Sequence, residues 1–203
     1  MKKQSNHLTP RSMSLQPVLI VAIALALATI TRLMPHTSNM TPFFAVGLAA
    51  GAWLGRERQI LAGLMVVVAM LVGDLALGLH WTMPFVYFGM YLGAVLGARS
   101  SQWLEGSDSA WGRMAKAAGV AGFGSLLFFV MSNLGVWFVG ELYPRTFEGL
   151  VQCFVMAVPF FKQSLATDLF FGSVFLYAVA LARRSFRDVS WIASQKGGSV
   201  HGG

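Results

Sequence analysis

One apolar stretch decides the fold class. Residues 59–79 read QILAGLMVVVAMLVGDLALGL, and the chain continues with His80 and with WTMPFVY at residues 81–87. A helix needs about 20 mostly apolar residues to cross the hydrocarbon core of a bilayer, and this stretch has that length. Its one charged residue, Asp74, is costly inside a membrane and such groups are usually functional. The segment from Asp74 onward is therefore the first place to look for a ligand site.

The composition of the whole chain is that of a membrane protein. Of 203 residues, 56% are hydrophobic and 11% are charged, whereas a soluble domain has about 25% charged residues. The net charge of +7 does not indicate nucleic-acid binding, because most basic residues flank apolar segments instead of forming one basic patch. The single cysteine, Cys153, excludes an internal disulfide and any site built from several cysteines.

Six apolar segments predict an all-α integral membrane protein with a six-helix transmembrane bundle. They cover residues 17–34, 42–55, 59–79, 84–98, 117–139 and 158–182. The second and fourth are short for a full crossing, so we expect them to be tilted, buried among neighbours or incomplete. We expect an N-terminal segment at 1–16 with an uncleaved first helix, one membrane domain at 17–182 and a basic tail at 183–203.

The basic residues predict how the bundle is oriented. Twelve of the fifteen lie in the N-terminal segment, the second-to-third loop, the fourth-to-fifth loop and the C-terminal tail. Only Arg32, Arg145 and Lys162 lie on the other side. Because cytoplasmic loops carry the excess of Lys and Arg, we expect both termini to be cytoplasmic.

This orientation places the polar residues of the spans near the outer side. Arg32, Asp74 and Asn133 lie near the outer ends of their helices, and Lys162 and Asp168 lie in the outer half of the sixth. The pattern predicts a cup that is open to the outside. The pairs Arg32–Asp74 and Lys162–Asp168 either hold helices together or support a site in this cup, and the sequence leaves both interpretations open.

The segment after Pro144 predicts a short lid helix at the outer surface. Thr146 is a plausible N-cap, and apolar residues then recur at 147, 150, 151 and 154, the spacing of one helix face. Nearby aromatic residues, Trp137 and Tyr143 together with Trp81, belong either to this cup or to the aromatic belt of the membrane interface.

Small residues predict close helix packing. Glycines recur every four residues in segment 42–55 and again in segment 84–98, which lets helix backbones approach one another. In the first helix, two overlapping Ala-x-x-x-Ala pairs are formed by Ala22, Ala24, Ala26 and Ala28. This alanine surface either packs within the chain or binds another membrane protein.

Together these features resemble the substrate-binding S-component of energy-coupling-factor (ECF) vitamin transporters. The outer-loop stretches are similar to the BtuM-like branch, which is predicted to transport cobalamin. These stretches are RLMPH at 32–36 with Asn39 and TP at 41–42, GDLALGLH at 73–80 with MPFVY at 83–87, SN at 132–133 with Trp137, and residues 143–161. The resemblance implies a six-helix S-component fold in the bacterial inner membrane, with cobalamin as bound ligand and no intrinsic cofactor. It also implies a coupling protein and two ATPases as partners, docking on the alanine surface.

The resemblance further implies a substrate site formed by the loops after the first, third and fifth helices. BtuM-like proteins can carry a cobalt-ligating cysteine where this chain has His80. Histidine at this position puts thiolate chemistry in doubt, including removal of an upper cobalt ligand, so we expect a binding protein and no enzyme. Imidazole is itself a good donor for cobalt, which makes His80 the candidate axial ligand. The alternative is a histidine that only bonds to a carbonyl or to water at a helix end.

Cobalamin is a wide disc rimmed by amides, so it needs an apolar platform with polar groups around it. The candidate platform consists of Phe43, Phe44, Trp81, Met83, Phe85 and Tyr87. The candidate rim consists of Asn39, Asn133, Tyr143 and Arg145.

Two other functions remain open from the sequence. An S-component for a smaller vitamin would share the topology and the cup but would need no metal ligand. A membrane enzyme would use Asp74, Asp168, His36 and His80 as a cluster near the outer surface. The chain has no Walker A motif, so hydrolysis of ATP at a P-loop would fall to a partner.

Overall fold

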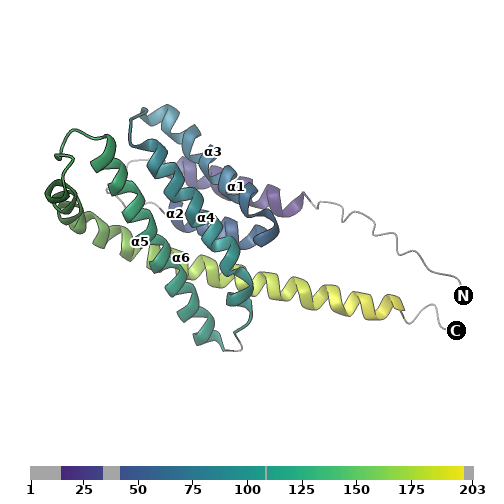
Figure 1. The fold of residues 1–203 in the computed structure, drawn as a ribbon. Coiled ribbons are helices and arrows are strands. Elements are labelled where there is room, and N and C mark those ends of the chain that lie inside the picture. Colours follow the sequence, from purple (N-terminus) through teal and green to yellow (C-terminus); the bar gives the residue numbers. More distant parts are fainter. Residues whose placement is uncertain (1–14, 34–41, 108, 199–203) are drawn as a thin grey trace, which may run out of the picture.

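The computed structural model describes residues 15–33, 42–107 and 109–198. In this part of the chain every regular element is helical (Figure 1). The elements are α1 (Gln16–Leu33), α2 (Phe43–Leu54), the 3-10 turn η1 (Arg56–Arg58), α3 (Gln59–Leu77), α4 (Met83–Glu105), α5 (Ala110–Val139) and α6 (Phe147–Gly198).

Among the described residues, four helical segments are long and apolar enough to cross a membrane. They are α1, the segment Arg56–Leu77 that contains α3, α5, and α6 as far as Phe186. The predicted all-α class is therefore confirmed. In contrast, α2 has 12 residues, which at 1.5 Å per residue makes it about 18 Å long, shorter than a hydrocarbon core of about 30 Å.

The short helix α2 lies at the centre of the fold. It packs against α1, α3, α4 and α6, and most of its residues are buried. A methyl group built on Gly51 would overlap the carbonyl of Ala94 on α4, and one built on Gly97 would overlap the carbonyl of Leu48 on α2. The two backbones therefore touch at these glycines, which confirms the close packing predicted from their spacing.

Helix α4 continues beyond residue 98, where its predicted apolar segment ends. The hydroxyls of Ser100 and Ser101 donate to carbonyls of the preceding turn at 2.9 Å, so their polarity is satisfied inside the helix. At its last residue, Glu105, the side chain is only 2% exposed and accepts a hydrogen bond from Nε of Arg183 on α6 at 2.6 Å. Ion pairing across helices thus allows a carboxylate to end α4 inside the fold.

Arg183 joins three helices at this end of the bundle. Besides binding Glu105, its Nη1 donates to the carbonyl of Trp53 at 2.7 Å, in the last turn of α2. Carbonyls in the last turn of a helix lack partners within the helix, and a cation there is stabilising. Arg183 therefore caps α2 while it connects α4 to α6.

Helix α6 is longer than predicted at both ends. It begins at Phe147 behind Thr146, whose Oγ1 accepts a hydrogen bond from the Gly149 N–H at 3.2 Å, as expected of an N-cap. The prediction of a separate lid helix is wrong, because α6 continues from Phe147 through Pro159 without ending. Proline removes one backbone N–H, and membrane helices tolerate this. The far end of α6, coloured yellow, extends beyond the other helices (Figure 1).

Candidate functional site

The last turn of α1 and the last turn of α3 are joined by an ion pair. Arg32 Nη2 lies 2.7 Å from Asp74 Oδ1, and the Asp74 side chain is 5% exposed. The guanidinium also lies 3.1 Å from the Met70 sulfur and 5.4 Å from the ring centre of Phe43. Gly73 leaves room for it, because a Cβ there would lie 3.2 Å from Nη1. Asp74 thus meets another helix, as expected.

The prediction that Lys162 pairs with Asp168 is wrong. Both residues lie on α6, six positions apart, which places them about 120° apart around the helix. Lys162 is exposed, whereas Asp168 is buried and accepts a hydrogen bond from the Ser125 hydroxyl of α5 at 2.8 Å. No ion pair forms between them in the described part of the chain.

His80 lies in the connection between α3 and α4. Helix α3 ends at Leu77, and Gly78 follows with φ of 106°, a left-handed conformation that favours glycine. Gly78 therefore ends the helix, as predicted. His80 is exposed, and its backbone N–H donates to the Met83 sulfur at 3.4 Å. The backbone at His80 is thus held by the turn at Gly78 before it and by the hydrogen bond to Met83 after it.

An open groove of about 480 Å³ lies beside this connection. Four predicted site residues line it, namely His80, Trp81, Met83 and Tyr87. The Tyr87 hydroxyl lies 3.5 Å from the Met83 sulfur and interacts with the carboxylate of Asp74. We call this groove the His80 groove. It lies next to the Arg32–Asp74 pair, because Tyr87 contacts both.

Two predicted platform residues lie elsewhere. Phe43 and Phe44 are only 3% and 6% exposed, and the Phe44 ring lies 5.4 Å from that of Phe128 on α5. Gly93 of α4 and Gly124 of α5 leave space that the Phe44 ring fills, whereas the Phe43 ring lies against the guanidinium of Arg32. Their assignment to the ligand platform is wrong, because they pack inside the bundle.

Phe85 is also turned away from the His80 groove. It presses on Gly135 of α5, where a Cβ would lie 2.6 Å from the Phe85 side chain, and its ring lies 6.0 Å from that of Phe138. Phe85 therefore connects α4 to α5 and does not line the groove.

The described rim residues are grouped at the far end of α5 and the start of α6. The side-chain amide of Asn133 donates to the Phe129 carbonyl of its own helix at 2.8 Å. In the connection that follows α5, Tyr143 is half-buried and Arg145 is exposed. The Trp137 indole holds this connection by donating to the Pro144 carbonyl at 3.1 Å. None of these residues lines the His80 groove. Asn39 lies outside the described residues.

The cluster expected of an enzyme does not form among its described members. Asp74 lies between α1 and α3, whereas Asp168 lies between α5 and α6. In the described ranges no three His, Cys, Asp or Glu side chains gather at one point. His36 lies outside them. The expectation that Asp74 and Asp168 share one site is therefore wrong.

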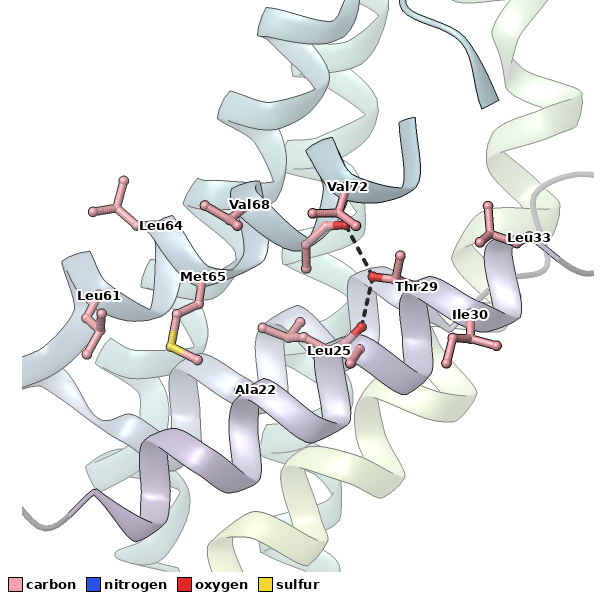
Figure 2. A pocket seen from close by; sticks show the side chains of 12 residues that line it. Ala22, Leu25, Thr29, Ile30, Leu33, Leu61, Leu64, Met65, Val68 and Val72 are labelled. Atoms are coloured by element: carbon pink, nitrogen blue, oxygen red, sulfur yellow. Dashed lines mark hydrogen bonds between the residues drawn. The ribbon is translucent and has the colours of Figure 1, made fainter. Parts of the chain in front are cut away.

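The alanine surface of α1 is divided between two grooves. Figure 2 shows the larger one, of about 610 Å³, between α1 and α3. Ala22 and Ala26 line it, and near its end the Thr29 hydroxyl lies 2.9 Å from the Leu25 carbonyl and 3.2 Å from the Ala69 carbonyl across the interface. Almost all of the remaining lining is aliphatic.

The second groove, of about 300 Å³, lies between α1, α2 and α6, and Ala24 lines it. Ala28 is only 5% exposed, so its assignment to a docking surface is wrong. Its position one turn further along α1 brings it against the core. Docking of a partner on Ala22, Ala24 and Ala26 stays a prediction.

The model of one protein family, described as a family of unknown function (DUF6580), matches residues 12–191. The chain belongs to this family. The match spans all of α1 to α5 and most of α6, so the arrangement described above lies almost wholly within the family segment. No curated protein and no solved structure matches the chain. The likeness to S-components therefore stays a prediction about this member of DUF6580.

Two features were not predicted from the sequence. The contacts of Arg183 with Glu105 and Trp53 join residues that are far apart in the chain, so no local pattern indicates them. The second feature is a polar cavity between α5 and α6. A signal for it is present, because Ser125 and Ser132 lie two turns apart on α5 and Ser164 and Asp168 lie one turn apart on α6.

Proposed function

We propose that this protein binds a vitamin of the cobalamin type at the membrane surface for uptake, with His80 as axial ligand of the cobalt. The observation that carries the proposal is an exposed histidine beside an open, largely apolar groove. Within the described ranges, no hydrogen bond to the imidazole is found. An imidazole nitrogen is therefore available to a metal, for which histidine is the commonest ligand.

The shape of the His80 groove supports contact with one face of a large disc. The groove is open to one side and about 480 Å³ in volume, too small to enclose a whole corrin. Trp81, which is 87% exposed, extends the apolar surface beyond it. Arg32 and Asp74 hold the ends of α1 and α3 together, which keeps this surface in place before a ligand arrives.

The basic residues support an outward-facing His80. Four basic residues lie at the end of the bundle where α4 ends and α5 begins, away from His80. They are Arg99, Arg113, Lys116 and Arg183. We propose that this basic end is cytoplasmic and that His80 faces outward. We further propose that a coupling protein binds the exposed grooves of α1 and that its ATPases supply the energy.

The proposal is tested by the visible absorption spectrum of cobalamin mixed with the purified, tag-free protein. We expect a stoichiometric shift that His80→Ala abolishes. His80→Cys should restore a shift of different shape, since a thiolate replaces the imidazole as ligand. His201→Ala, which removes a histidine of the C-terminal tail, is the matched control and should leave the shift unchanged. An unchanged spectrum and affinity in His80→Ala would overturn the role of His80.

A smaller vitamin is the second candidate ligand. A volume of about 480 Å³ lies within the range of about 300–1,000 Å³ that is typical of small-molecule sites. Mass spectrometry of the ligand that copurifies with the protein separates the two candidates. A corrinoid would support the first, and a smaller compound bound without a spectral change would support the second.

A further inference from the structure

The cavity between α5 and α6 differs in chemistry from every other hollow described above. It has a volume of about 170 Å³, whereas a water molecule takes up about 30 Å³ in the liquid. Its polar lining comes from Ser125, Ser132, Asn133 and Ser164, and phenylalanines close its sides. A cavity with several polar groups and room for more than one water molecule is expected to be hydrated.

Asp168 does not itself line this cavity, but it is hydrogen-bonded to Ser125, which does. Ser125 donates to Asp168 Oδ2 at 2.8 Å, and Ser164, one turn earlier on α6, lines the cavity itself. Asp168 Oδ1 accepts no hydrogen bond from a described residue, yet it is not among the fully buried polar atoms that lack a partner. This oxygen is therefore open to a water molecule.

No cation in the described part of the chain neutralises Asp168. The residue is 5% exposed, and neither of the ion pairs of the described residues involves it. A carboxylate at this depth in a membrane span is costly without a positive partner. Protonation removes that cost, because a neutral carboxyl group needs only hydrogen-bond partners.

The elements packed against α6 bring no titratable group to Asp168. Helix α2 contains none. On α4, Tyr91 lies against Gly63 of α3, Tyr87 interacts with Asp74, Arg99 binds Gln59 and Glu105 binds Arg183.

On α5, the nearest basic residue to Ser125 is Lys116, nine positions earlier, or about 14 Å along the helix axis, and it donates to the Trp103 carbonyl. On α6 itself, Lys162 is exposed and lies on another side of the helix. Binding of a proton is therefore the way in which the charge of Asp168 can be neutralised.

We propose that the α5–α6 cavity is a hydrated proton-binding site whose titrating group is Asp168. In the uptake step a hydronium ion transfers its proton to Asp168 at Oδ1, the oxygen that Ser125 does not occupy, and leaves a water molecule behind. In the release step the proton returns to a water molecule, and the Ser125 hydroxyl stabilises the carboxylate at Oδ2. This site does not depend on the cobalamin proposal, since it shares no residue with the His80 groove.

Infrared difference spectroscopy of the full chain in lipid, recorded between acidic and alkaline pH, tests the proposal. A protonated carboxyl group gives a C=O band that ionisation removes. We expect such a band in the wild-type protein, its loss in Asp168→Asn, and its retention in Asp74→Asn, the matched control at a buried carboxylate that has an ion-pair partner. In D₂O the band should shift, because a hydrated cavity lets the carboxyl proton exchange with solvent.

Two further variants keep the test decisive if Asp168→Asn does not fold. Ser125→Ala retains the carboxyl group but removes its hydrogen-bond donor, so the band should move. Ser164→Val fills part of the cavity, so the shift in D₂O should become slower. A band that Asp168→Asn retains and Ser125→Ala leaves in place, the absence of any band in the wild type, or a band insensitive to D₂O would each overturn the proposal.

Discussion

At the scale of single residues, two carboxylates of this chain are equally buried but differently partnered. Asp74 has Arg32 at 2.7 Å, whereas among the described residues Asp168 has only the Ser125 hydroxyl. A buried ion pair is strongly destabilised when one partner is removed, because the remaining charge is left without compensation. Loss of the charge partner should therefore be costly at Asp74, whereas Asp168 has no such partner among the described residues to lose.

We expect Arg32→Ala to lower the free energy of unfolding by about 3–5 kcal/mol, the usual cost of breaking a buried pair from one side. The double variant Arg32→Ala/Asp74→Ala should be less destabilised than Arg32→Ala alone. Chemical denaturation in detergent measures both. Arg184→Ala, at an exposed arginine, is the control and should change stability by less than about 0.5 kcal/mol. Equal losses in the single and double variants would contradict the pair.

At the scale of elements, the contact between α2 and α4 depends on the absence of side chains. In a membrane, helix association rests mainly on van der Waals packing and interhelical hydrogen bonds, because lipid is as apolar as the helices. Gly51 and Gly97 place each backbone against the other, so even a methyl group must separate the helices.

Gly51→Ala should therefore lower the free energy of unfolding by about 1–3 kcal/mol, the usual cost of overpacking. Gly119→Ala is the matched control, because Gly119 lies in a helix where a Cβ meets open space. In an exposed helix, alanine in place of glycine is favourable by about 0.5–1 kcal/mol. Thermal unfolding of both variants in the same detergent gives the comparison, and similar midpoints would argue against the close contact.

The same elements show what hydropathy predicts well and what it does not. The bounds of α1 and α3 follow from runs of apolar residues, because a lipid-facing helix must be apolar along its length. The end of α4 does not, because Glu105 is stabilised by Arg183 from a distant helix. Phe44 looks like a ligand contact by type and position, but the space that buries it is created by glycines on other helices. Such tertiary partners are far away in the chain, so the local sequence does not indicate them.

At the scale of the whole molecule, the charge distribution predicts which surface each connection faces. The connection before α6 should lie outside the cell, and the connection between α4 and α5 should lie inside. Cys153 is 2% exposed, and replacing it by alanine leaves a chain without any thiol for labelling experiments.

In this Cys153→Ala background, we expect Glu141→Cys to react with a membrane-impermeant maleimide on intact cells. Gly106→Cys should react only after the membrane is permeabilised. Both positions are exposed, so the difference reports the side of the membrane and not burial. The opposite pattern would reverse the orientation and place His80 on the cytoplasmic side.

The length of α6 has a practical consequence for imaging. At 22.0 kDa the protein offers little mass outside a detergent micelle for the alignment of particle images in electron cryo-microscopy. Helix α6 has 52 residues, or about 78 Å at 1.5 Å per residue, and its far end extends beyond the other helices (Figure 1). A rigid helical marker protein fused in register to this end, without a flexible linker, would give the particle a recognisable feature outside the micelle.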